Sequence, residues 1–286
     1  MNTALPDLGR YGVFSPLTYL PPAARDKIAR ELEKLGFGAI WLANSTVEEA
    51  APVLAATSTI AVGTAIQSIW RYEAGQTRAT FAELDAKYPG RLVLGLGVAH
   101  AQNTAEYTRP YPSMVAYLDA LDAAEDGTPV PAERRLLAAL GPKMTELARD
   151  RAAGTLPYLV TAEQVATARQ ALGERAFLAP ELGVVLEADP DRARALARSA
   201  LERYTTMTNY ANNWLRGGFT EDDLVGGGSD RLIDALFAWG DDERVRARIE
   251  AFRSAGADHV VLQPVHDDPH GPASPAAWRR LAELLP

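Results

Sequence analysis

Short apolar segments alternate with amphipathic helical segments along most of the chain. Residues 10–15 predict a strand, and apolar residues then recur at helical spacing from Ile28 to Leu35 before Gly36 ends the helix. A second apolar strand is expected at residues 37–43, so the chain begins with a β-α-β unit whose connections are short. Such a unit pairs its two strands in parallel through a right-handed crossover.

The same alternation continues to the C-terminus. Further strands, each followed by a helical pattern, are expected at residues 59–67, 92–98, 134–140, 156–161, 176–187 and 256–263. Eight such strands predict an α/β fold, a (β/α)8 TIM barrel that forms a single domain over residues 1–286. A doubly wound sheet is the alternative, but residues 15–17 after the first strand lack the glycine-rich turn of a dinucleotide-binding fold.

The fourth strand is unusual because Gly95 and Gly97 lie near its end and His100 follows it. Glycines in a strand allow another backbone or a flat ligand to approach closely. In a parallel barrel the C-terminal ends of the strands form the ligand site, so His100 is expected to face it. The alternative is that the glycines relieve crowding inside the barrel and that His100 is an ordinary loop residue.

Two other segments carry candidate chemistry. Gly141, Pro142 and Lys143 separate the fifth strand from a helix, and the free N–H groups of a helix N-terminus bind anions. A common turn with a solvated lysine is the alternative. Residues 209–214 place three asparagines among two aromatic residues, which favours either substrate contacts or the start of a packed helix.

Composition narrows the function classes. The net charge of −8 argues against nucleic acid or an anionic membrane as a partner. Because the chain contains no cysteine, redox chemistry would need a bound cofactor. The four histidines lack metal-ligand spacing, and no nucleophile elbow is present. No apolar stretch approaches the roughly 20 residues of a membrane span, so we expect a cytoplasmic enzyme without a metal.

Three stretches, residues 36–41, 60–66 and 89–98, together resemble the bacterial-luciferase-like monooxygenase superfamily. Within it the chain is most similar to actinobacterial oxidoreductases that use the deazaflavin coenzyme F420. The similarity extends through residues 140–144 and 209–214, so it covers nearly the whole chain. It implies F420-dependent hydride transfer to or from a small organic substrate. An FMN-dependent monooxygenase and a non-catalytic cofactor-binding barrel are the alternatives.

The resemblance also implies roles for individual residues. A non-prolyl cis peptide bond is expected at Ala65–Ile66 or Ile66–Gln67, beside the cofactor ring. The ring would contact Thr64, Ala65, Ile66, Gln67, Gly97, Val98 and Ala99, and the cofactor phosphate would contact Leu140, Gly141, Pro142, Lys143 and Met144. His100 and Asn44 are the candidate catalytic residues, and Trp70, Tyr107, Asn213 and Trp214 are the candidate walls of the substrate pocket. The superfamily usually forms dimers, so a homodimer is expected.

Overall fold

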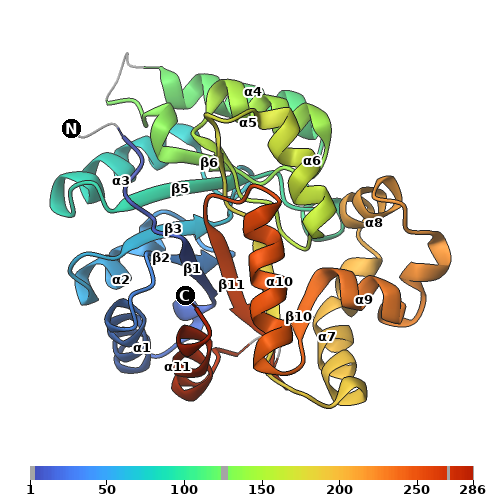
Figure 1. Ribbon diagram of the computed structural model, residues 1–286. Coiled ribbons are helices and arrows are strands. Elements are labelled where there is room, and N and C mark those ends of the chain that lie inside the picture. The colour runs from blue at the N-terminus through green and yellow to red at the C-terminus, as the bar shows by residue number, and fades with distance from the viewer. Residues whose placement is uncertain (1–3, 124–127, 269–270, 286) are drawn as a thin grey trace.

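Parallel strands form a ring with helices packed around it, as the computed structural model shows for residues 4–123, 128–268 and 271–285 (Figure 1). The strands are β1 (Tyr11–Ser15), β2 (Ala39–Ala43), β3 (Ala61–Ala65), β4 (Gln67–Ser68), β5 (Leu92–Gly97), β6 (Arg135–Leu137), β7 (Gly154–Thr155), β8 (Phe177–Leu178), β9 (Glu181–Val185), β10 (Phe237–Trp239) and β11 (Val260–Pro264).

The helices follow the strands as the sequence pattern predicts. They are α1 (Pro22–Lys34), α2 (Ala51–Ala56), α3 (Ala74–Lys87), α4 (Pro110–Asp122), α5 (Pro142–Arg151), α6 (Ala162–Leu172), α7 (Pro190–Thr205), α8 (Thr208–Arg216), α9 (Asp230–Leu236), α10 (Asp242–Ser254) and α11 (Pro275–Glu283). Short 3₁₀ helices are η1 (Leu17–Tyr19), η2 (Glu48–Ala50), η3 (Ala101–Asn103), η4 (Ala132–Arg134) and η5 (Glu221–Gly227). N-cap side chains, such as those of Asp189 on α7 and Ser274 on α11, accept hydrogen bonds from free backbone N–H groups at the helix starts.

The hydrogen-bonded strand order is β10-β9-β11-β1-β2-β3-β5-β6-β7-β8. β8 and β9 belong to one extended segment, interrupted at Ala179 and Pro180. On one side of this segment the N–H of Ala179 donates to Thr155 O, and on the other side the N–H of Val261 donates to Pro180 O, both at 2.9 Å. The segment therefore joins the two ends of the order and closes the ring. This confirms the predicted α/β barrel and excludes a doubly wound sheet.

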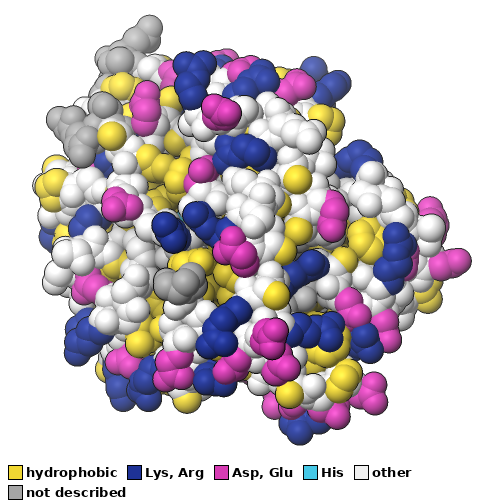
Figure 2. All heavy atoms as spheres, in the orientation of Figure 1, with side chains coloured by type: hydrophobic (Ala, Val, Ile, Leu, Met, Phe, Trp, Pro, Cys, Tyr) yellow, Lys and Arg dark blue, Asp and Glu magenta, His cyan; other side chains and the backbone are white. Residues whose placement is uncertain are grey.

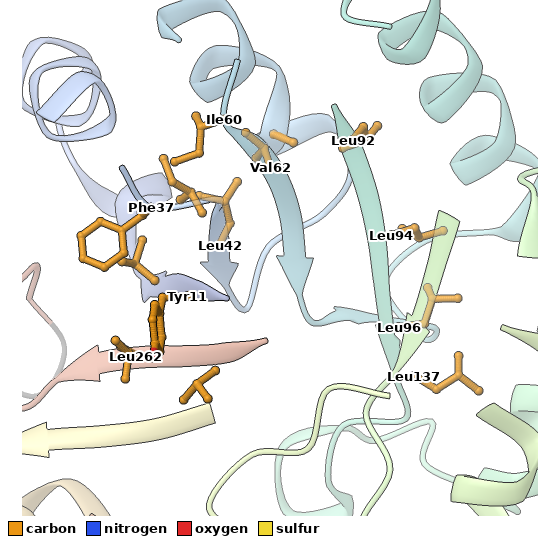
Figure 3. Close-up of a cluster of buried hydrophobic side chains, with 14 of the residues drawn as sticks. Tyr11, Phe37, Leu42, Ile60, Val62, Leu92, Leu94, Leu96, Leu137 and Leu262 are labelled. Atoms are coloured by element: carbon orange, nitrogen blue, oxygen red, sulfur yellow. The ribbon is translucent and has the colours of Figure 1, made fainter. Parts of the chain in front are cut away.

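Alternate side chains of each strand enter different layers of the core. Leu42, Val62 and Leu94 pack outward beneath the surrounding helices, as Figure 3 shows. Trp41 and Val93, each next to one of them in the chain, belong to a separate cluster inside the ring. This two-residue period is the one expected for strands buried on both faces.

The inner cluster fills one end of the barrel. Trp41 Nε1 donates to His259 Nε2 at 3.0 Å, and both side chains are fully buried. Gly63 and Gly12 make room for them, because a Cβ atom would lie 2.4 Å from the Trp41 ring at position 63 and 2.3 Å from His259 Nε2 at position 12. His259 is therefore a structural residue of the barrel floor.

The connection between the seventh and eighth barrel strands departs from the prediction. Helices α7, α8 and α9 lie at the right of Figure 1 and pack around a second hydrophobic cluster, to which β9 and β10 also contribute. Helix α9 ends at Leu236, because residues 237–239 form β10 and pair in parallel with the free edge of β9. The predicted sixth strand, 156–161, is replaced by β7 at 154–155. Pro157 cannot donate to a sheet ladder, and Leu159 has a positive φ of 54°.

The surface carries both signs of charge. On the face that Figure 2 shows, basic and acidic side chains are interspersed over most of the helices. None of the described helices is long and apolar enough to cross a membrane.

Candidate active site

A large cavity opens at the C-terminal ends of the barrel strands. Residues directly after β2, β3, β5 and β6 line it, and its volume is about 1740 Å³. That volume exceeds the roughly 300–1,000 Å³ of a pocket for one small ligand. The cavity therefore has room for two organic molecules side by side, at the end of the barrel where this fold places its active sites.

Most of the residues expected from the sequence line this cavity. The peptide bond Ala65–Ile66 is cis, at one of the two expected positions. The expected residues that line the cavity are Asn44, Ala65, Ile66, Trp70, Gly97, Val98, Ala99, His100, Tyr107, Leu140, Gly141, Pro142, Lys143 and Met144.

Thr64 and Gln67 do not line the cavity, contrary to the expectation. The Thr64 hydroxyl donates to Gly95 O at 2.8 Å and accepts the Gly95 N–H at 2.9 Å, so it links β3 to β5. The buried Gln67 amide accepts from the Val47 N–H at 2.7 Å and donates to the Thr77 hydroxyl at 2.8 Å. Both side chains face away from the cavity because the barrel wall uses their hydrogen-bonding groups.

Asn213 and Trp214 are also wrongly placed by the sequence interpretation. Both are buried, and neither lines the cavity. Trp214 Nε1 donates to Leu159 O at 2.9 Å, and its ring stacks on Tyr210 at 5.8 Å between centroids. The residues of α8 that line the cavity include Asn209 and Asn212 instead. The sequence identified the segment but not its rotation, which packing against the neighbouring cluster determines.

The two glycines of β5 serve packing of the barrel. A Cβ atom on Gly95 would lie 2.0 Å from Thr64 O, and one on Gly97 would lie 2.8 Å from Ile66 Cδ1. They allow the end of β3 to approach β5, which favours the structural interpretation of these positions. Gly97 also lines the cavity, so this close approach shapes its wall.

His100 is half-buried on the cavity wall beside α8. Asn209 Nδ2 lies 3.4 Å from its Nδ1, and the Tyr210 ring lies 5.0 Å from its ring centre. Because an amide N–H only donates, Nδ1 accepts in this arrangement and the ring proton resides on Nε2. Burial, and to a lesser degree the Arg203 charge, lowers the pKa of His100 below its usual 6.5. At neutral pH the ring is uncharged and able to accept a proton.

Asn44 lies elsewhere on the cavity rim. Its backbone N–H donates to Ala65 O at 3.0 Å, and its side chain donates to the Tyr19 hydroxyl at 3.3 Å. Its φ of 46° is a conformation that asparagine adopts more readily than most residues. Asn44 and His100 therefore belong to different groups of side chains along the same cavity.

A cluster of hydrogen-bond donors lies at the start of α5. Gly141 is the N-cap residue, and in the described part of the chain the N–H groups of Gly141 and Lys143 have no backbone acceptor. Arg216 Nη2 lies here too, 3.8 Å from where a Cβ of Gly141 would be. Free N–H groups, a helix N-terminus and two cations form a site that suits a phosphate group. Sequence reasoning found Lys143 but missed Arg216, which comes from the distant α8.

Sequence reasoning also missed a buried carboxyl group, Glu181, at the inner part of the cavity. Glu181 is 3 % exposed and lines the cavity, and its Oε2 accepts the Leu159 N–H at 3.2 Å. Burial raises its pKa to about 8. A glutamate directly after Pro180, at the start of an otherwise apolar strand, was the available signal.

In the part of the chain that the structure covers, no group of three or more potential metal ligands occurs.

Comparisons with known proteins agree with this architecture. A family model described as luciferase-like monooxygenase matches residues 14–259. Among curated proteins, none is a significant sequence match to the chain. An F420-dependent secondary alcohol dehydrogenase, solved with an F420-acetone adduct, superposes with a TM-score of 0.71 at 16% identity, covering 96% of this chain and 98% of that one.

Two further solved structures share the fold. The F420-dependent tetrahydromethanopterin reductase from Methanopyrus kandleri has a TM-score of 0.71 at 16% identity, over 96% of this chain and 98% of that one. The oxygenating constituent of 3,6-diketocamphane monooxygenase from Pseudomonas putida, in complex with FMN, has a TM-score of 0.64 at 14% identity, over 96% of both chains. At these identities the likeness concerns the fold.

Proposed function

The chain belongs to the luciferase-like monooxygenase family, and on that premise we propose that it is an F420-dependent oxidoreductase. In this proposal a hydride moves between the deazaflavin and a carbon of a small organic substrate, both held in the cavity at the barrel mouth. One observation carries the proposal: the anion site at α5 and the wall formed by residues 65–66 and 97–99 line the same cavity.

The anion site is proposed to hold the cofactor phosphate. The N–H groups of Gly141 and Lys143 point out of the helix start, and Arg216 adds a fixed positive charge beside them. A phosphate suits this set better than a neutral group because donors and cations gather there without a carboxylate in hydrogen-bond contact among the described residues. From this site a flat ring would extend along residues 97–99 toward residues 65–66.

The remaining volume is proposed as the substrate site. Trp70 and Tyr107 form one wall, with their ring centres 6.2 Å apart, and Trp70 is fixed by donating from Nε1 to Val98 O at 2.7 Å. His100 borders the same space, where Asn209 Nδ2 lies 3.4 Å from His100 Nδ1 and 3.5 Å from the Tyr107 hydroxyl, and His100 is the proposed proton partner. The cofactor, when bound, supplies the hydride chemistry, while these residues orient the substrate and exclude water.

Two features favour F420 over FMN. The two superposed enzymes with a TM-score of 0.71 are both named as F420-dependent, whereas the FMN complex has a TM-score of 0.64. The chain also supplies an uncharged His100 as proton acceptor at neutral pH, which suits oxidation of an alcohol by hydride removal. The FMN-dependent monooxygenase remains the alternative enzyme, and a barrel that binds the cofactor without turnover is the alternative of another class.

Cofactor titrations followed by a turnover assay test the proposal. We expect F420 to bind more tightly than FMN, measured by quenching of cofactor fluorescence, and F420 to be reduced only when an alcohol is added. Gly141→Asp should weaken the binding, and Gly75→Asp, also near a helix start but outside the cavity, is the matched control. Preference for FMN with oxygen-dependent product formation would instead establish the monooxygenase.

A further inference from the structure

Glu181 occupies the layer of the barrel directly above the filled floor. Ala179, two residues earlier in the same extended segment, belongs to the inner hydrophobic cluster with Trp41 and Val261. Because side chains alternate along a strand, Glu181 points to the same interior as Ala179, one layer nearer the mouth. It thus brings a carboxyl group to the inner end of the cavity, where Leu156 and Val261 provide apolar surface.

This carboxyl group is only half satisfied. Its Oε2 accepts the Leu159 N–H, but within the described residues its Oε1 has no hydrogen-bond partner. No arginine, lysine or histidine forms an ion pair with it there. A buried polar atom without a partner costs about 1–3 kcal/mol, so such an atom in a ligand cavity calls for a functional explanation.

We propose that the carboxyl group of Glu181 is a substrate-recognition group, which hydrogen-bonds a carbonyl or hydroxyl oxygen at the inner end of the bound substrate. The inference rests on the proposed function in one respect, because it takes the occupant of the inner cavity to be the substrate rather than the cofactor. The inference also specifies the class of substrate. The substrate is a compound with a carbonyl or hydroxyl oxygen on the end that lies deepest in the cavity.

The protonation state of Glu181 determines what it recognises. Since burial raises its pKa to about 8, the group is a neutral acid at pH 7 and donates one hydrogen bond. The terminal torsion of a glutamate rotates easily, so either carboxyl oxygen can carry the proton toward a ligand. Above pH 8 the group becomes a carboxylate, which accepts hydrogen bonds only and no longer binds a carbonyl oxygen.

Other ionisable groups near Glu181 do not titrate in the same range. Burial raises the pKa values of Tyr158 and Tyr210 well above 10, so their hydroxyls remain neutral. His100 has a pKa below 6.5 and is uncharged above neutral pH, and Arg203 has a raised pKa and stays charged. Gln263, a further polar residue on the cavity wall, accepts the Tyr158 hydroxyl at 3.0 Å and does not ionise. A change in ligand binding near pH 8 therefore reports on Glu181.

Infrared difference spectroscopy with acetone and cyclohexanone as probes tests the proposal without turnover. In the parent protein at pH 7, binding should lower the carbonyl stretching frequency of each ketone. Binding should also shift the band of a protonated carboxyl group. Glu181→Leu should remove that carboxyl band and bind the ketones about 2- to 10-fold more weakly. Glu181→Gln keeps a donor at every pH, so it should bind the ketones with an affinity that no longer falls above pH 8.

Glu187→Gln is the matched control, because it makes the same change near the end of the same segment and outside the cavity. It should retain the parent's bands and pH dependence. Absence of ketone-induced shifts in the parent, or unchanged ketone binding in Glu181→Leu, would overturn the proposal, and so would a carboxyl shift caused by F420 alone. A separate F420 titration tests the proposed function: ketone shifts without F420 binding would refute that function and leave the recognition role intact.

Discussion

Arg216 lies at the end of α8, yet its Nη2 donates to the carbonyl oxygen of Leu140, at 3.2 Å, just before α5 begins. The same nitrogen also donates to Asn213 Oδ1 at 3.2 Å, so the buried Asn213 orients the guanidinium. A residue 76 positions away in the chain thereby adds a fixed positive charge to the start of α5. The anion site is thus assembled from two elements, and each can be tested.

Gly141→Asp should weaken cofactor binding by at least about tenfold, which corresponds to about 1.4 kcal/mol. The new carboxylate would lie at the helix N-terminus and beside Arg216, where it competes with the phosphate for the same donors. Open space surrounds the position apart from Arg216 Nη2, so the stability of the fold should change little. Fluorescence titration measures the binding and urea unfolding the stability. Equal cofactor affinity in variant and parent would contradict the phosphate site.

Arg216→Ala should weaken cofactor binding more than Lys143→Ala does. Both side chains are exposed, but Arg216 is oriented by two hydrogen bonds, whereas Lys143 makes none among the described residues and must lose conformational freedom to bind. We expect about a tenfold loss for Arg216→Ala, from a charged hydrogen bond of about 1.5 kcal/mol, and a smaller loss for Lys143→Ala. Arg175→Ala, at an exposed arginine outside the cavity, is the control in the same titration. The reverse order of the two effects would show that Lys143 is the main contact.

The barrel was predictable from the sequence because its pattern is local. Each strand between residues 10 and 100 is a short apolar run followed by a helix with its own end signal, such as Gly36. The interruption of the seventh strand by Pro180 was also visible, since proline cannot donate to a sheet ladder. β10 was not predictable, because 237–239 form a strand only where the edge of β9 is available to pair with them.

The site was predictable where residues directly follow a strand, as His100 does. It was not predictable where a helix contributes side chains from a distance. The rotation of α8, which turns Asn209 to the cavity and Trp214 to the core, depends on the packing of Tyr210 and on the Leu159 carbonyl group. Neither contact has a local signature in the sequence. Thr64 and Gln67 were wrongly assigned because the barrel wall, not the cavity, uses their polar groups.

His259 should make the protein sensitive to acid. Burial lowers its pKa from 6.5 to about 4, so between these values the unfolded chain binds the proton and the folded chain does not. Stability that is present above pH 6.5 is therefore lost as the pH falls toward 4. His259→Gln should be less stable than the parent at pH 7 by about 1–3 kcal/mol, because the hydrogen bonds to Trp41 and Gly9 are disturbed. Its stability should fall less steeply with acid, which urea unfolding at a series of pH values measures. Equal slopes would contradict this.

The protein should form a homodimer in solution, as the resemblance to its superfamily implies. A net charge of −8 on each chain does not prevent association. Light scattering at several protein concentrations should give about twice the 30.8 kDa mass of the chain. The apparent mass should fall below this value only on strong dilution. A mass near 30.8 kDa at all concentrations would refute the dimer.

His100→Asn should separate a catalytic role of His100 from a binding role. As proton acceptor the ring must be neutral, so the parent's kcat should fall on the acid side with a midpoint below pH 6.5, where burial and Arg203 place its pKa. Asparagine retains a polar group beside Asn209 but cannot take up a proton. A catalytic role therefore predicts unchanged cofactor affinity, a kcat about 10²-fold lower and loss of the acid limb. A binding role predicts weaker cofactor affinity with kcat largely intact at saturation. If affinity and kcat both survive, the proton must pass through another group, and Glu106, Tyr107 and water held by Asn44, all on the same cavity, are the next to replace.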